Sequence, residues 1–158
     1  MVELTLPPQI RVTKDKDGHV VVERGPLLYA LSVQGTRRAA DEWGSFEEFV
    51  TPDSKWNYAL LLDRSNPASS MSFERMAPVR SGSVWEHPPC GIRVDAARLP
   101  DWKFDREIAA AIPKFAHDIP EPPVPPQPWK RAADEKVLLV PYGFTLLRMA
   151  HLPVIWAA

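Results

Sequence analysis

The sequence has little cysteine, no cluster of basic residues and no long hydrophobic run, and each shortage excludes a class of protein. A single cysteine, Cys90, excludes an intramolecular disulfide and any metal site that needs several thiolates. The 19 basic residues are balanced by 20 acidic ones and never stand more than two together, so we expect no nucleic-acid partner. No apolar stretch approaches the roughly 20 residues needed to span a bilayer, and we expect no membrane segment.

Motifs for nucleotide, serine-hydrolase and metal chemistry are also missing. With only 7 glycines, the chain contains no Walker-type loop, no G-x-G-x-x-G and no G-x-S-x-G. The 4 histidines lack ligand spacing, and in the local group Glu86, His87 and Cys90 two prolines restrict how the side chains converge. We therefore predict no metal and no cofactor. The N-terminus has neither the basic nor the apolar region of a secretory signal, which predicts a cytoplasmic location.

Proline, in contrast, is abundant, with 18 in 158 residues. Proline breaks helix interiors and interrupts central strands, so this density favours short strands joined by stiff connections. The length and the 45% hydrophobic content predict one globular domain over residues 1–158. Residues 113–128 hold seven prolines and are predicted to be an extended connector within it. A Pro-x-x-Pro ligand for an aromatic groove is the alternative.

Alternating apolar and polar residues indicate many short strands. The clearest run places Trp56, Tyr58, Leu60 and Leu62 on one face of a strand. Asp17-Gly18 is a hairpin signal. Residues 34–48 are polar and irregular, with a helical turn or a strand as alternatives near their end, and one or two helical turns are predicted over 105–112. Strands are expected at 2–6, 10–13, 19–23, 27–33, 56–62, 70–74, 92–94, 102–104, 136–140, 144–149 and 154–156. The pattern predicts an all-β, antiparallel, jelly-roll-like β-sandwich with long proline-rich connections.

The six tryptophans are candidates for binding sugars, because an exposed indole offers a flat apolar face with a polar N–H. Trp56 and Trp102 lie in strand patterns and are expected in the core. Trp43, Trp85 and Trp129 lie in polar or proline-rich surroundings and are the predicted carbohydrate-binding residues, with core packing as the alternative.

No catalytic residue is predicted. With 20 carboxylates in the chain, pairs of them must meet on any surface, and the sequence favours no particular pair. Cys90 has His87 and Arg93 three residues away on either side, which could lower its pKa. A free cysteine is more often a small buried hydrophobe.

Several segments, in their order along the chain, resemble the C-terminal β-sandwich region of glycoside hydrolase family 127, the β-L-arabinofuranosidase-like enzymes. They are VELTLP at 2–7, VERGPLLY at 22–29, SKWNYAL at 54–60, LPDW at 99–102, the proline-rich run, LVPYG at 139–143, LLR at 146–148 and LPV at 152–154.

The resemblance implies a β-sandwich that follows an (α/α)6 catalytic barrel. The family's cysteine nucleophile and zinc site lie in that barrel, and Cys90 matches no part of them, so no catalytic role is carried over to it. The expected function is therefore a non-catalytic accessory domain, not an enzyme on its own, that supports or dimerises a barrel in cis or on a separate chain. The alternatives are a carbohydrate-binding module for plant cell-wall oligosaccharides and a scaffold subunit docking on a separately encoded glycosidase. A homodimer is a further option.

Overall fold

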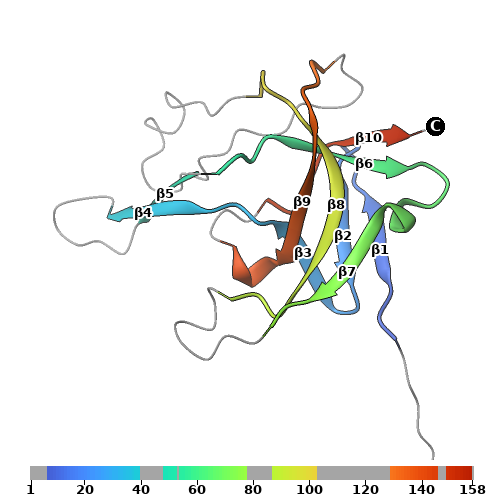
Figure 1. Ribbon diagram of the computed structural model, residues 1–158, viewed down its shortest axis with the longest axis horizontal. Coiled ribbons are helices and arrows are strands. Elements are labelled where there is room, and N and C mark those ends of the chain that lie inside the picture. Colours follow the sequence, from blue (N-terminus) through green and yellow to red (C-terminus); the bar gives the residue numbers. More distant parts are fainter. Residues whose placement is uncertain are drawn as a thin grey trace, which may run out of the picture.

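The structure is a computed structural model that describes residues 7–39, 48–52, 54–77, 87–102, 129–145 and 149–157 (Figure 1). Within these residues the regular structure consists of β-strands and two short 3-10 turns, so the all-β prediction is confirmed. None of these residues forms a helix with the length and apolarity that crossing a membrane requires. The elements are β1 (Ile10–Lys14), β2 (Val20–Arg24), β3 (Leu27–Leu31), β4 (Gly35–Ala39), β5 (Glu48–Pro52), β6 (Tyr58–Asp63), η1 (Pro67–Ser70), β7 (Met71–Arg75), β8 (Cys90–Arg98), β9 (Asp134–Pro141), η3 (Tyr142–Phe144) and β10 (Val154–Ala157).

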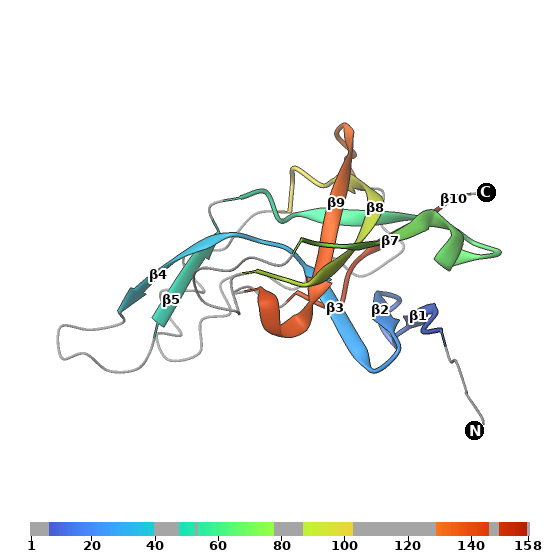
Figure 2. The same cartoon turned by 60° about the horizontal axis from the view of Figure 1, so that its bottom comes forward.

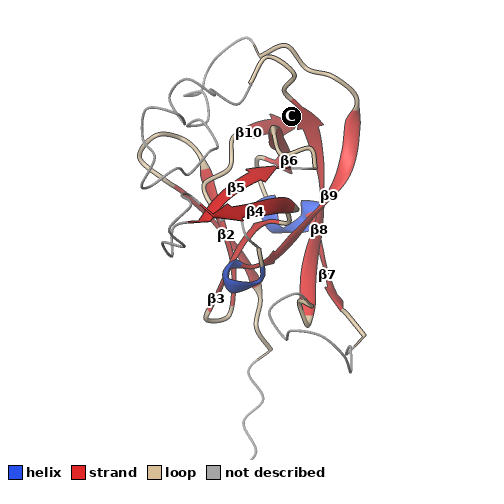
Figure 3. Ribbon diagram, turned by 90° about the vertical axis from the view of Figure 1, so that its left-hand side faces the viewer, coloured by secondary structure: helices blue, strands red, loops and turns tan. Residues whose placement is uncertain are grey.

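Eight of the strands join into one curled sheet, in the order β1-β2-β3-β9-β8-β6-β10, with β7 paired to β8 (Figures 1 and 3). All neighbours are antiparallel except β6 and β10, which run parallel. β4 and β5 form a separate two-stranded ribbon that extends to one side of the sheet (Figure 2). The described strands thus form one curled, mixed sheet with a separate ribbon, and the two stacked antiparallel layers expected from the sequence are not confirmed.

The curl brings the two ends of the sheet together. The amide of Val20, at the start of β2, donates to the Leu152 carbonyl at 2.8 Å, and the Leu152 amide donates back to the Val20 carbonyl at 3.0 Å. One residue further on, the Pro153 carbonyl accepts the Leu60 amide of β6 at 2.9 Å. The segment before β10 thus connects β2 to β6 through backbone hydrogen bonds, and this connection holds the curl together.

The core fills the inside of this curl. Leu60 and Leu62 of β6 are fully buried and Tyr58 is only 5% exposed, because the period of two along a strand places all three on the same face. Leu31 of β3 and its strand partner Leu139 of β9 belong to the same core cluster. The predicted inward face of β6 is confirmed, as is the burial of Trp56 and Trp102, each 8% exposed.

Two glycines make the hairpins possible. Gly18 (φ 87°) turns the chain from β1 into β2, as the Asp-Gly signal predicts, and Gly25 (φ 58°) turns it from β2 into β3. The Asp15 carboxylate braces the first turn by accepting the amides of Asp17 and His19, each at 2.9 Å. β3 then lies between β2 and β9, a central position that its apolar sequence predicts.

Several local expectations were wrong. Residues 35–39, expected to be irregular, form β4, because pairing with β5 supplies the hydrogen bonds that their polar sequence did not predict. The strand at 92–94 is part of the much longer β8, and Trp102 follows a turn rather than lying in a strand. Tyr142–Phe144 is a 3-10 turn at the start of the strand expected over 144–149. The predicted strand at 2–6, the helical turns at 105–112 and the connector at 113–128 lie outside the described residues.

Candidate functional site

Of the three tryptophans predicted to bind sugar, the structure describes one. Trp43 and Trp85 lie outside the described residues. Trp129 is partly buried and packs against the core, and its indole Nε1 is buried with no hydrogen-bond partner among the described residues. A role for these three side chains in stacking on sugars stays a prediction.

Cys90, the other residue singled out from the sequence, contacts Tyr29. Its Sγ lies 3.4 Å from the phenol oxygen, and burial, followed by this contact, raises the pKa of Tyr29 above its usual value. His87 is exposed, and Arg93 forms an ion pair with Glu74 at 2.9 Å, so its guanidinium is held by a carboxylate. The described residues contain no group of three metal-ligating side chains arranged to hold an ion.

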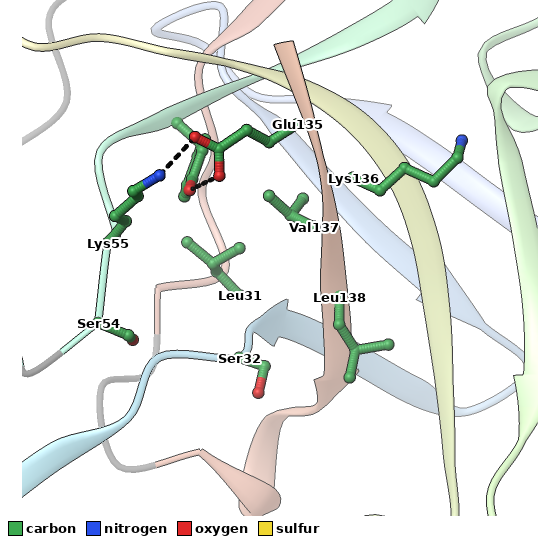
Figure 4. Close-up of a pocket in the computed structure, with 9 residues that line it drawn as sticks. Leu31, Ser32, Ser54, Lys55, Glu135, Lys136, Val137 and Leu138 are labelled. Carbon is green, nitrogen blue, oxygen red and sulfur yellow. Dashed lines mark hydrogen bonds and ion pairs between the residues drawn. The ribbon is translucent and has the colours of Figure 1, made fainter. Parts of the chain in front are cut away.

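A cleft that the sequence did not predict lies where the β4–β5 ribbon leaves the curled sheet (Figure 4). Its volume is about 380 Å³. Besides β9, the chain borders it at the end of β3 and again just before β6, and the amide of Gln34 donates to Ser54 Oγ at 3.0 Å to join these two segments. The described residues lining the cleft are Leu31, Ser32, Ser54, Lys55, Tyr58, Glu135, Lys136, Val137 and Leu138.

Glu135 is the central polar residue of this cleft. It shares a face of β9 with the buried Val137 and Leu139, so strand alternation turns its carboxylate toward the inside at the end of the sheet. There Lys55 Nζ donates to Oε1 at 2.7 Å and the Tyr58 hydroxyl donates to Oε2 at 3.0 Å. Figure 4 shows both contacts converging on the carboxylate from the β6 side.

These contacts fix the charge state of the cleft. The ammonium of Lys55, and then the Tyr58 hydroxyl, lower the pKa of Glu135 below its usual value. Burial of the phenol, together with its bond to Glu135, raises the pKa of Tyr58 to about 12. At neutral pH the cleft therefore presents an ionised carboxylate, a neutral phenol and an ammonium group.

This arrangement suits binding better than acid catalysis. A general acid for glycoside cleavage needs a raised carboxyl pKa, and that of Glu135 is lowered. Hydrolysis by two carboxylates also needs a second one, whereas Glu135 is the single acidic residue among the described residues that line the cleft. What remains is a set of hydrogen-bonding groups around an apolar floor, which is typical of a small-molecule binding site.

Sequence reasoning missed the cleft because its polar residues are far apart along the chain. Lys55 and Glu135 are 80 positions apart, and Tyr58 and Glu135 are 77 apart. The available signal was the acidic residue placed on the inward face of a strand otherwise rich in apolar residues. Comparison of the chain with family models, with curated proteins and with solved structures found no match.

Proposed function

We propose that this chain is a non-catalytic accessory β-domain of a glycoside hydrolase similar to family 127, which supports or dimerises an (α/α)6 catalytic barrel. The observation that carries the proposal is the contact between two of the family-like segments. Asn57 Nδ2 donates to the carbonyls of Leu99 at 2.8 Å and Trp102 at 3.0 Å, so SKWNYAL holds LPDW in place.

Aromatic packing and strand pairing extend this network. The rings of Trp56 and Trp102 meet edge to face with centroids 4.8 Å apart. Tyr29, at the end of VERGPLLY, pairs with Pro141 of LVPYG across β3 and β9. The residues that carry the resemblance are therefore used to hold the domain together. This structural role of the segments supports an accessory function, in which the folded domain itself supports the catalytic barrel.

The carboxylates support the same conclusion. The pKa values of Asp15, Asp63 and Glu135 are all lowered. For Asp63 the main cause is the hydrogen bond from the Ser65 hydroxyl, followed by backbone amides. These groups are ionised at neutral pH, and none of the three is suited to protonate a leaving group.

The test is association with a barrel. The chain is mixed with the (α/α)6 barrel of a family 127-like enzyme expressed without its own β region, and the mixture is analysed by sedimentation velocity. We expect a stable complex, formed with one chain per barrel or with a chain dimer. Two separately sedimenting species at every concentration would refute the accessory role. Sedimentation velocity of the chain alone tests the predicted homodimer.

Carbohydrate binding is the second candidate function, and the polar cleft beside Glu135 is the observation that favours it. A role as a scaffold subunit for a separately encoded glycosidase, the plant cell-wall oligosaccharide ligand and the cytoplasmic location stay predictions. A quench of tryptophan fluorescence by such oligosaccharides, lost in Trp43→Ala, Trp85→Ala or Trp129→Ala, would support the tryptophans as the binding residues. If no oligosaccharide in a broad panel changes the fluorescence, the three tryptophans are not sugar-binding residues.

A further inference from the structure

We propose that the cleft beside Glu135 binds one ring of a neutral sugar, with hydroxyl groups on the polar rim and the C–H face on the apolar floor. The inference rests on the proposed function only for the choice of sugars to test. Its physical basis is the hydrogen-bonding capacity that the rim residues retain, the neutrality of the rim, and the shape and lining of the floor.

The rim keeps both donors and acceptors for a ligand. The Lys55 ammonium has three donors, of which Glu135 takes one, and its side chain is 50% exposed. The Glu135 carboxylate has about four lone-pair sites, and Lys55 and Tyr58 occupy two of them. Ser54 Oγ accepts the Gln34 amide, and its hydroxyl proton is donated to none of the described residues. A sugar hydroxyl both donates and accepts, so neighbouring hydroxyls match this mixed set.

Charge selects a neutral ligand. Lys55 and Glu135 form an ion pair at 2.7 Å and offset each other. Lys136 also borders the cleft, but its ammonium points to the other side of β9, where it pairs with Asp95 at 2.9 Å (Figure 4). An anion placed on this rim would face the Glu135 carboxylate, and a cation would face Lys55. The rim therefore offers neither an anion nor a cation a net opposite charge.

The floor and the volume fit one sugar ring. Leu31 of β3 and Val137 of β9 are nearly buried apolar side chains that form the floor, whereas Leu138, like Lys136, points to the other side of β9 (Figure 4). The volume of about 380 Å³ falls at the lower end of the range for small-molecule sites, roughly 300–1,000 Å³. Because the floor belongs to paired strands, the ligand binds a surface already formed, and little ordering of the protein opposes binding.

The experiment is a titration of the isotopically labelled chain, followed by backbone amide NMR shifts. The probes are L-arabinose, methyl β-L-arabinofuranoside and D-glucose, with inorganic phosphate as the charged comparison. We expect saturable shifts with roughly millimolar dissociation constants, centred on residues 54–58 and 135–138. Shifts caused by phosphate alone would mean an anion site and would overturn the proposal, as would shifts centred on Trp129 instead.

Two substitutions test the rim, and one serves as a control. Glu135→Gln and Lys55→Gln each remove one charge and its free hydrogen-bonding capacity, and we expect at least a tenfold weaker affinity for the sugar from each. Asp95→Asn makes the same carboxylate-to-amide change in an exposed ion pair on the other face and should leave affinity unchanged. Amide spectra of all three variants establish that they are folded. Equal affinity in Glu135→Gln, Lys55→Gln and Asp95→Asn would refute the site.

The outcome separates this inference from the accessory role. A chain that binds the barrel but shows no sugar-dependent shift refutes the sugar site alone. A chain that binds sugar in the cleft but never associates with a barrel refutes the accessory role alone.

Discussion

Replacing Asn57 with alanine perturbs the contact on which the proposed role depends. Asn57 is 8% exposed, and its amide nitrogen donates to two backbone carbonyls of the turn that follows β8. Its own backbone carbonyl accepts the Leu99 amide at 2.8 Å, a bond that alanine retains. The substitution therefore removes the side-chain bonds while keeping the backbone connection.

The two carbonyls differ in what they lose. The Leu99 carbonyl still accepts the Trp102 amide at 3.0 Å, so there only the net value of one hydrogen bond is lost, about 0.5–1.5 kcal/mol. The Trp102 carbonyl has no other partner among the described residues, and an unsatisfied buried carbonyl costs about 1–3 kcal/mol. Together we expect a loss of about 1.5–4.5 kcal/mol in the free energy of unfolding. For a chain of this length that corresponds to a fall in Tm of about 3–18 °C.

Urea unfolding followed by far-UV circular dichroism measures the loss, and near-UV dichroism reports the Trp56–Trp102 contact. Asn66→Ala is the matched control, because Asn66 is exposed and its side chain makes no capping bond to η1. That variant should stay within about 0.5 kcal/mol of the parent. If Asn57→Ala cost no more than Asn66→Ala, the reasoning that the family-like segments hold the domain together would be refuted.

Three further predictions concern other parts of the molecule. Gly91→Ala would place a Cβ 2.6 Å from Leu138 Cδ1 and 3.1 Å from a backbone carbonyl oxygen. We expect urea unfolding to show a loss of about 1–3 kcal/mol in the free energy of unfolding. An unchanged free energy would contradict the packing described. The pKa of Asp15 is lowered because, although burial raises it, the hydrogen bond from His151 and two backbone amides outweigh burial. The stabilisation by ionised Asp15 is therefore present above the unfolded pKa near 3.8 and is lost as pH falls further. We expect the Tm difference between the parent and Asp15→Asn to shrink from pH 7 to pH 3. A constant difference would contradict this role of Asp15. The pKa of Tyr58 is raised to about 12, so its contribution to stability is complete below pH 10 and is lost as pH rises toward 12. In an ultraviolet titration, the Tyr58→Phe variant should lack one phenol that in the parent ionises near pH 12 rather than 10.

The strands that the sequence predicts well are those whose periodicity reflects burial. β6 is the clearest case, because Tyr58, Leu60 and Leu62 all enter the core. β4 has the sequence GTRRA, which carries no apolar alternation, and its strand conformation comes from pairing with β5. No local pattern reports such a partner, and for that reason the strand was missed.

Closure of the sheet was unpredictable for a related reason. The hydrogen bonds between Val20 and Leu152 join residues from opposite ends of the chain, and backbone bonds leave no mark on side-chain type. The cleft is similar, since Lys55 and Glu135 meet only after the sheet has curled. Glu135 alone carried a local signal, as a charged residue in line with the inward-facing Val137 and Leu139.

The central claim, that this chain assists a catalytic barrel without catalysing by itself, is tested most directly by hydrolysis of an aryl β-L-arabinofuranoside. Turnover is measured for the chain alone, for a family 127-like barrel lacking its β region, and for the two together. The account predicts a rate at buffer background for the chain alone and a higher or longer-lived activity of the barrel when the chain is added. Turnover by the chain alone, or a barrel whose activity and stability do not respond to it, would contradict the account.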